Sequence, residues 1–150
     1  MTTPYQYTES GLDNVWLIGG VEFVDRPSGR EVKIKNIDGL HREIGRILTE
    51  VKKNLTGREI RFLRQEMLMS QATLAKLLKV SEQTIHRWES GKADIPKSAE
   101  SLIRLYYRAR GESVELSAAL RLLADIEDEI DGHDFKVDFE KKSGWQLRAA

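Results

Sequence analysis

SQATLAKLLKVSEQTIHRWESGK, residues 70–92, predicts two short helices joined by only Lys79 and Val80. A serine precedes each helix and is expected to cap it by accepting a backbone N–H: Ser70 for the first and Ser81 for the second. The expected helices cover residues 71–78 and about 82–89. Because the link is so short, neither helix can continue through the other, and the two must cross steeply. This stretch therefore predicts a compact helical corner.

The second helix of the corner is expected to turn a polar face outward. Ile85 and Trp88 share the side that faces the core, whereas Gln83, Thr84 and Arg87 lie on the opposite side. Gln83 and Arg87 are four residues apart and so are neighbours on one stripe. A glutamine amide can pair with adenine and a guanidinium with guanine in a major groove about 12 Å wide. Gln83, Thr84 and Arg87 are therefore the candidates for contacts with DNA bases.

Polar residues near the ends of these helices form a second group of candidates. Hydroxyls, amides, backbone N–H groups and an ammonium at such positions are suited to phosphate oxygens. The candidates for contacts with the DNA backbone are Ser70, Gln71, Ser81, Ser90 and Lys92. Glu82 would repel phosphates, so it either accepts a hydrogen bond from the cytosine amino group or supplies negative charge at the start of its helix, and we prefer the second role.

Two further helices flank the corner. Thr56 and Glu59 form a capping-box pattern that opens a helix whose inward residues are Ile60, Leu63 and Met67. Gly91 is expected to end the second corner helix with a positive φ. Pro96 is placed in the first turn of a helix that runs to about Arg110. The apolar residues expected in its core-facing side are Leu102, Ile103, Leu105 and Tyr106.

At these residues the chain resembles the Xre or lambda-repressor-like helix-turn-helix family over about residues 56–110. The matching pattern is Ser70-Gln71-x-x-Leu74-Ala75 followed by Val80-Ser81-x-x-Thr84-Ile85-x-Arg87-Trp88-Glu89-x-Gly91. The resemblance implies that Gln71 contacts the DNA backbone or a base, and that outward residues of the next helix enter the groove.

A wider resemblance includes residues 7–15 and the segment Gly39-Leu40-His41. With these segments included, the chain is similar to the carboxyl-terminal region of MqsA/YgiT-type antitoxins. The longest members of that group begin with a Cys-x-x-Cys zinc domain. This chain has no cysteine, so that zinc domain is missing.

The first 54 residues predict a small α+β extension. Residues 14–18 and 21–24 flank Gly19-Gly20, which predicts a hairpin with a primed turn. Residues 25–29 are expected to form a loop and residues 31–35 a third strand. Asp38 is expected to cap a helix. The apolar stripe of that helix comprises Leu40, Ile44, Ile47, Leu48 and Val51.

Beyond Gly111, residues 114–130 predict an amphipathic helix, and residues 135–147 a short terminal hairpin. The expected fold class is therefore mainly α. It comprises a lambda-repressor-like helix-turn-helix bundle (55–110), a small N-terminal α+β extension (1–54) and a C-terminal helix plus short β hairpin (111–150).

Composition supports a nucleic-acid partner through the distribution of charge. The formal net charge is zero, but residues 52–110 hold 13 Lys/Arg against 6 Asp/Glu, a net charge of +7. The segments on either side carry −2 and −5. Phosphate neutralisation requires a local cationic surface and not a cationic total.

Other classes of protein are disfavoured. No apolar run approaches 18 residues and the start lacks the pattern of a secretory signal, so we expect a cytoplasmic protein without a membrane span. With no cysteine and three scattered histidines, we expect no metal and no other cofactor. No nucleophile–base pair or phosphate-cradling Gly loop can be assembled, which argues against an enzyme.

We therefore predict a sequence-specific transcriptional regulator, a homodimeric repressor that binds a palindromic operator in double-stranded DNA. The alternative is an antitoxin whose partner is a toxin protein and which autoregulates its operon. A third possibility is a protein adaptor built on the same fold.

Overall fold

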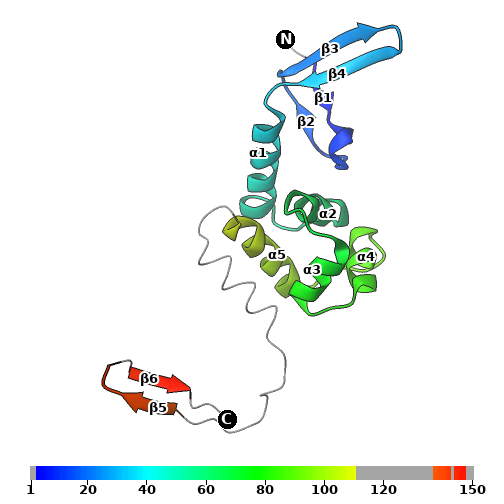
Figure 1. The fold of residues 1–150 in the computed structure, drawn as a ribbon. Helices are drawn as coiled ribbons and strands as arrows, with labels where there is room; N and C mark the ends of the chain where they lie inside the picture. The colour runs from blue at the N-terminus through cyan, green and yellow to red at the C-terminus, as the bar shows by residue number, and fades with distance from the viewer. Residues whose placement is uncertain (1–2, 111–136, 143, 148–150) are drawn as a thin grey trace.

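The computed structural model describes residues 3–110, 137–142 and 144–147 (Figure 1). Within these residues, short strands come first, five helices follow, and a hairpin comes last. In chain order the elements are β1 (Tyr5–Gln6), the 3-10 turn η1 (Thr8–Ser10), β2 (Trp16–Leu17), β3 (Val21–Arg26), β4 (Gly29–Ile34), α1 (Ile37–Glu50), α2 (Gly57–Glu66), α3 (Gln71–Leu78), α4 (Glu82–Glu89), α5 (Lys97–Ala109), β5 (Val137–Glu140) and β6 (Gly144–Leu147). The fold class is mainly α, as predicted.

The strands of the N-terminal extension pair differently from the prediction. The expected hairpin across Gly19-Gly20 is wrong: β2 pairs with β1, and β3 pairs with β4 across Pro27-Ser28. Both glycines do have positive φ, 77° and 71°, but they connect two separate sheets. The physical reason is the length of the partner, because β4 offers β3 a six-residue ladder and β2 has only two residues. The expected loop at 25–29 shrinks to this tight turn.

Helix α1 starts with a different cap from the one predicted. Asn36, in the left-handed region with φ of 49°, accepts the Gly39 N–H through its side chain at 3.2 Å. Asp38 is therefore a first-turn residue and not the cap. The predicted apolar stripe is partly wrong, because Ile47 and Val51 are 38% and 64% exposed. Ile44 and Leu48 of the stripe are buried, and Gly45 beside them is buried as well.

The caps of α2, α3 and α4 form as predicted. Thr56 and Glu59 make both hydrogen bonds of the capping box at the start of α2. Ser70 and Ser81 each accept a backbone N–H three residues ahead, at 3.0 and 3.1 Å. These bonds are local, so the sequence pattern was sufficient to predict them.

Helix α5 departs from the prediction in two ways. Pro96 is its N-cap and does not lie within the first turn. Ile103 and Tyr106 are buried as expected, but Leu102 and Leu105 are 40% and 44% exposed. Tyr107 is buried in their place, because it packs against α1 where Gly45 leaves room. A Cβ on Gly45 would lie 1.8 Å from the Tyr107 hydroxyl.

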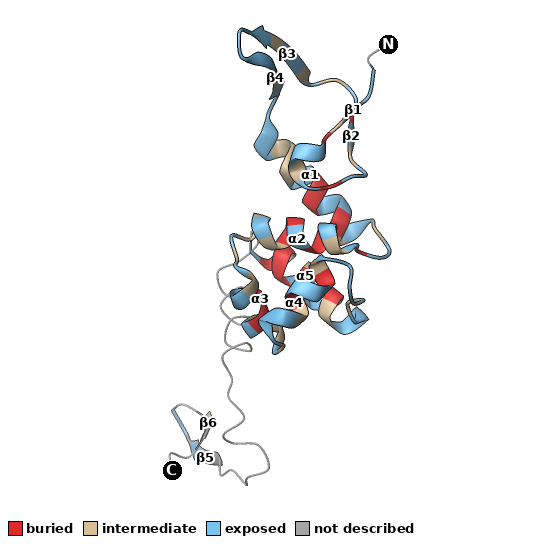
Figure 2. Cartoon of the chain, turned by 90° about the vertical axis from the view of Figure 1, so that its right-hand side faces the viewer, coloured by how far each residue is buried: buried red, intermediate tan, exposed pale blue. Residues whose placement is uncertain are grey.

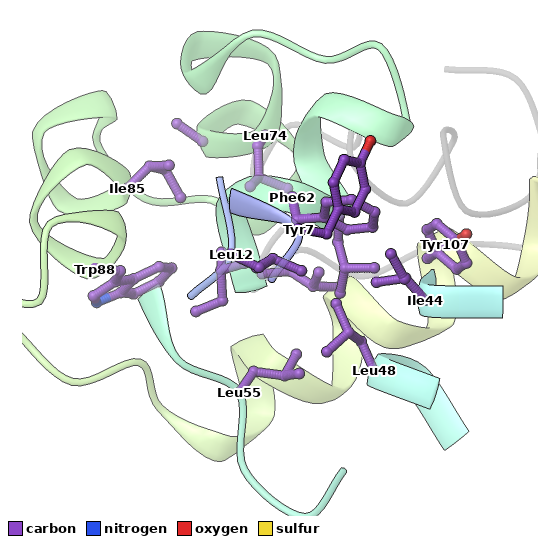
Figure 3. Close-up of a cluster of buried hydrophobic side chains, with 14 of the residues drawn as sticks. Tyr7, Leu12, Ile44, Leu48, Leu55, Phe62, Leu74, Ile85, Trp88 and Tyr107 are labelled. Carbon is purple, nitrogen blue, oxygen red and sulfur yellow. The ribbon is translucent and has the colours of Figure 1, made fainter. Parts of the chain in front are cut away.

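One continuous core joins the N-terminal extension to the helices. Figure 3 shows Tyr7 and Leu12 of the extension among side chains from α1, α2 and α4. The helices present their buried residues toward one another, whereas β3 and β4 are largely exposed (Figure 2). The principal members of the core are Tyr7, Leu12, Leu17, Ile44, Leu48, Leu55, Ile60, Phe62, Leu63, Leu74, Ile85, Trp88, Ile103 and Tyr107.

Polar contacts reinforce the same junction. The Tyr7 hydroxyl lies 2.8 Å from Nε2 of His41, and the other ring nitrogen of His41 contacts Glu66 of α2. Glu59, only 1% exposed, accepts from Lys52 at the end of α1 and from Asn14 of the extension. Helix α2 is therefore held by polar as well as apolar contacts.

The predicted terminal hairpin is present as β5 and β6, which pair antiparallel from Val137↔Leu147 to Glu140↔Gly144. The rings of Phe139 and Trp145 lie 5.3 Å apart between centroids. The helix predicted at 114–130 falls outside the described residues.

The buried carboxylate of Glu100 joins α5 to the segment before α2. It accepts the Leu55 N–H at 2.5 Å and lies 3.1 Å from the Lys97 ammonium and 3.4 Å from Arg104. Burial opposes ionisation of Glu100, but the Leu55 amide and the two cations outweigh burial, so the pKa of Glu100 lies below its ordinary value.

Glu100→Gln should lower the free energy of unfolding at pH 7 by about 1–3 kcal/mol, since it removes a charge-assisted partner of a buried amide. A folded-state pKa below the unfolded one gives stability that is present above about pH 4.3 and is lost as the pH falls through the folded pKa. The difference between variant and wild type should therefore shrink in acid. Urea unfolding across pH measures it, with the exposed Asp13→Asn as control. Identical pH profiles for Glu100→Gln and wild type would contradict this role.

Candidate nucleic-acid interface

The corner between α3 and α4 is tight. Lys79 ends α3 in the left-handed region with φ of 58°, and the Val80 N–H returns to the Ala75 carbonyl at 3.0 Å. The chain then enters the Ser81 cap at once. Small Ala75 is 4% exposed where the two helices meet, and Leu74 and Ile85 are fully buried. This packing fixes the direction of α4 relative to α3.

An ion pair between α2 and α4 anchors the corner to the rest of the domain. Arg64 and Glu89 meet through two hydrogen bonds of 2.7 and 2.9 Å, and their side chains are only 11% and 5% exposed. Such a two-pronged guanidinium–carboxylate pair fixes orientation as well as distance. This pair was not predicted from the sequence. A signal was present, because Glu89 follows the buried Ile85 by four residues and so lies on the same side of α4.

The same ion pair reaches the start of α3. Arg64 also donates to the Met69 carbonyl at 2.9 Å, and the Gln71 amide donates to Glu89 at 3.2 Å. Gln71 is therefore half-buried, and its amide nitrogen is used inside the protein. Its carbonyl oxygen accepts no hydrogen bond from the described residues.

Close backbone contact holds the other end of α2 against α4. A Cβ on Gly57 would lie 2.4 Å from the Trp88 carbonyl oxygen and 2.7 Å from that of Glu89. Only glycine permits this approach without a shift of one backbone. With the Arg64–Glu89 pair, it leaves α4 little freedom to rotate about its axis.

The orientation of α4 places Gln83 and Arg87 at the surface. Both are exposed, whereas Ile85 and Trp88 on the opposite side are 0% and 5% exposed. The side chains of Gln83 and Arg87 make no hydrogen bond within the described part of the chain. Thr84 is half-buried, and its hydroxyl lies 2.8 Å from that of Ser81.

The candidates for backbone contacts surround this face. Ser70 and Ser81 are exposed, although their hydroxyls already cap α3 and α4. The Ser90 hydroxyl donates to the Arg87 carbonyl at 3.2 Å. Lys92, which follows Gly91 with φ of 78°, is exposed and has no ion-pair partner among the residues that the structure describes.

The segment that contains this corner matches a known protein family. Residues 60–105 match a family model described as "Helix-turn-helix". This segment is an Xre-type helix-turn-helix domain. No curated protein and no solved structure matches the chain significantly. The resemblance to MqsA/YgiT-type antitoxins, stated above from the sequence, stays a prediction.

The helix-turn-helix match supports a DNA-binding regulator of the Xre type. In the part of the chain that the structure describes, no group of three or more His, Asp or Glu side chains could hold a metal ion. None of the described helices is long and apolar enough to cross a membrane.

Glu89→Gln should lower the free energy of unfolding of the helix-turn-helix domain by about 3 kcal/mol, because it leaves the buried Arg64 charge without its carboxylate. Glu82→Gln makes the same chemical change on an exposed face of the same helix and should cost less than about 0.5 kcal/mol. Chemical denaturation of both variants measures the difference. Equal losses from the two variants would show that the Arg64–Glu89 pair does not anchor α4.

Proposed function

We propose that the protein is a sequence-specific transcriptional regulator that inserts α4 into the major groove of duplex DNA. The exposure of Gln83 and Arg87 on a helix held in place by Arg64–Glu89 carries this proposal. The two side chains project from the same face of α4 and form no hydrogen bond or ion pair with the described part of the chain. A duplex groove of about 12 Å accepts one helix in this manner.

Each base-contacting residue has a distinct role in this proposal. Arg87 would bond to both acceptors on the edge of a guanine, and Gln83 would pair with an adenine. Thr84 is half-buried, and its hydroxyl is already hydrogen-bonded to that of Ser81. Its methyl group is therefore better suited than its hydroxyl to contact a base, and would meet a thymine methyl.

Backbone contacts would set the depth of α4 in the groove. The N-termini of α3 and α4, capped by Ser70 and Ser81, present N–H groups to phosphates. Gln71 would contact DNA through its side-chain carbonyl oxygen, or its amide nitrogen would donate to DNA in place of Glu89. Ser90 and Lys92 would bind phosphates of the DNA strand that passes the end of α4. These contacts position the protein without selecting a sequence.

The operator is proposed to be a palindrome bound by a homodimer, and the protein a repressor that occupies promoter DNA. One recognition helix contacts only a few base pairs, so a dimer with half-sites about 34 Å apart doubles the selected sequence. The N-terminal extension exposes Trp16, Ile18 and Phe23, at 57%, 78% and 50%, and these suit a protein interface. Since its target is genomic DNA, the protein would act in the cytoplasm.

The same exposed apolar residues also suit the alternative partner, a toxin protein bound by an autoregulating antitoxin. A ribonuclease-like reading frame beside the gene would favour this alternative. Both functions use the helix-turn-helix domain in the same way, so DNA binding does not distinguish them.

Arg87→Ala should lower affinity for the selected operator by about 1–3 kcal/mol and relax the preference at one base pair. Binding to random duplex should change much less. Competition binding with both duplexes measures the ratio. Arg42→Ala, which removes an exposed arginine from α1, is the control and should leave the ratio unchanged. Equal weakening on operator and random DNA would exclude base contact by Arg87.

Lys92→Ala should instead weaken binding to all duplexes alike. Loss of one phosphate contact should make the slope of log affinity against log salt shallower by about one. Lys33→Ala, an exposed lysine of β4, is the matched control. A salt slope equal to that of the wild type would remove Lys92 from the backbone contacts.

A further inference from the structure

A polar hollow of about 370 Å³ lies where α2, the start of α3 and the end of α4 meet. Its lining comes from all three helices and is entirely polar or charged. The residues are Arg61, Arg64, Gln71, His86, Glu89 and Ser90. Arg61 was not among the candidates from the sequence, because it meets the end of α4 only when α2 packs on α4.

The hollow has one positive charge that no carboxylate of the described residues balances. Arg64 and Glu89 neutralise each other in their ion pair. Arg61 is exposed, and its guanidinium makes no hydrogen bond or ion pair with any described residue. An unpaired guanidinium with five N–H donors, beside a serine and an imidazole, is suited to an oxyanion with several acceptor oxygens.

The position of the hollow identifies the source of that oxyanion. Gln71 and Ser90, both proposed above to lie near the DNA backbone, form part of its lining. A DNA strand that passes the end of α4 would therefore bring a phosphate to the same hollow. The hollow is open to solvent and lies on the face that carries Gln71 and Ser90. A phosphate of the bound duplex therefore fits it better than a separate small ligand does.

We infer that Arg61, from the hollow beside the α2–α4 ion pair, contacts a backbone phosphate of the DNA and extends the footprint from the α3–α4 corner onto α2. The inference rests on the proposed function. It adds one phosphate contact from a helix outside the corner, and it gives the Arg64–Glu89 pair a second role as the neutral floor of the site.

The experiment measures binding of the full chain to duplex DNA as a function of salt. Arg61→Ala should weaken operator and random DNA alike. Because one fewer counterion is released, the affinity lost between about 50 and 200 mM salt should be smaller by about three- to fourfold. Arg42→Ala is the control, and thermal unfolding should show that both variants are folded. An unchanged salt slope for Arg61→Ala would overturn the inference.

A second measurement locates the phosphate. In operator duplexes with single neutral methylphosphonate linkages, one position should weaken the wild type and leave Arg61→Ala unaffected. If no position loses its effect in Arg61→Ala, the inference fails. Stabilisation of the wild type by about 10 mM inorganic phosphate, with normal DNA binding by Arg61→Ala, would also overturn it, because the hollow would then hold a free anion. A wild type that binds no duplex would instead refute the proposed function.

Discussion

The orientation of α4 depends on the buried pair between Arg64 and Glu89. A guanidinium and a carboxylate removed from water are costly unless both are satisfied, so this contact tolerates few alternative geometries. Its extensions to the Met69 carbonyl and to Gln71 tie the start of α3 to the same point. Gly57 then brings the backbones of α2 and α4 together at the opposite end of α2. The outward direction of Gln83 and Arg87 follows from these constraints and not from any contact of their own.

The N-terminal extension also stabilises these helices, through contacts with the core and with α2. Tyr7 and Leu12 complete the core that α1, α2 and α4 form, and Glu59 links Asn14 and Lys52 to the first turn of α2. Helix α2 is therefore held by the extension on one side and by α4 on the other. Changes in the extension would reach α4 through α2, which gives the extension a structural role in addition to any role as an interface.

Local features of the fold could be predicted from the sequence, whereas partners distant in the chain could not. The caps at Thr56, Ser70 and Ser81 depend on atoms within three residues, and the structure confirms them. The Gly19-Gly20 pair correctly indicated positive φ, but turn chemistry does not select a strand partner, and β4 was the longer one. Arg64 and Glu89 are 25 residues apart, so only the assembled fold shows the pair. The exposure of Gln83 and Arg87 agrees with the helical pattern, while their contacts with bases are a proposal.

The role of α4 in sequence selection can be tested by selecting duplexes from a random pool with the full chain, and again with a variant that carries both Gln83→Ala and Arg87→Ala. The wild type should enrich a short motif, present as two inverted copies about one helical turn apart. The doubly substituted variant should retain DNA binding and lose the motif. Enrichment of the same motif by both proteins, or of no motif by the wild type, would contradict the claim that the outer face of α4 selects the sequence.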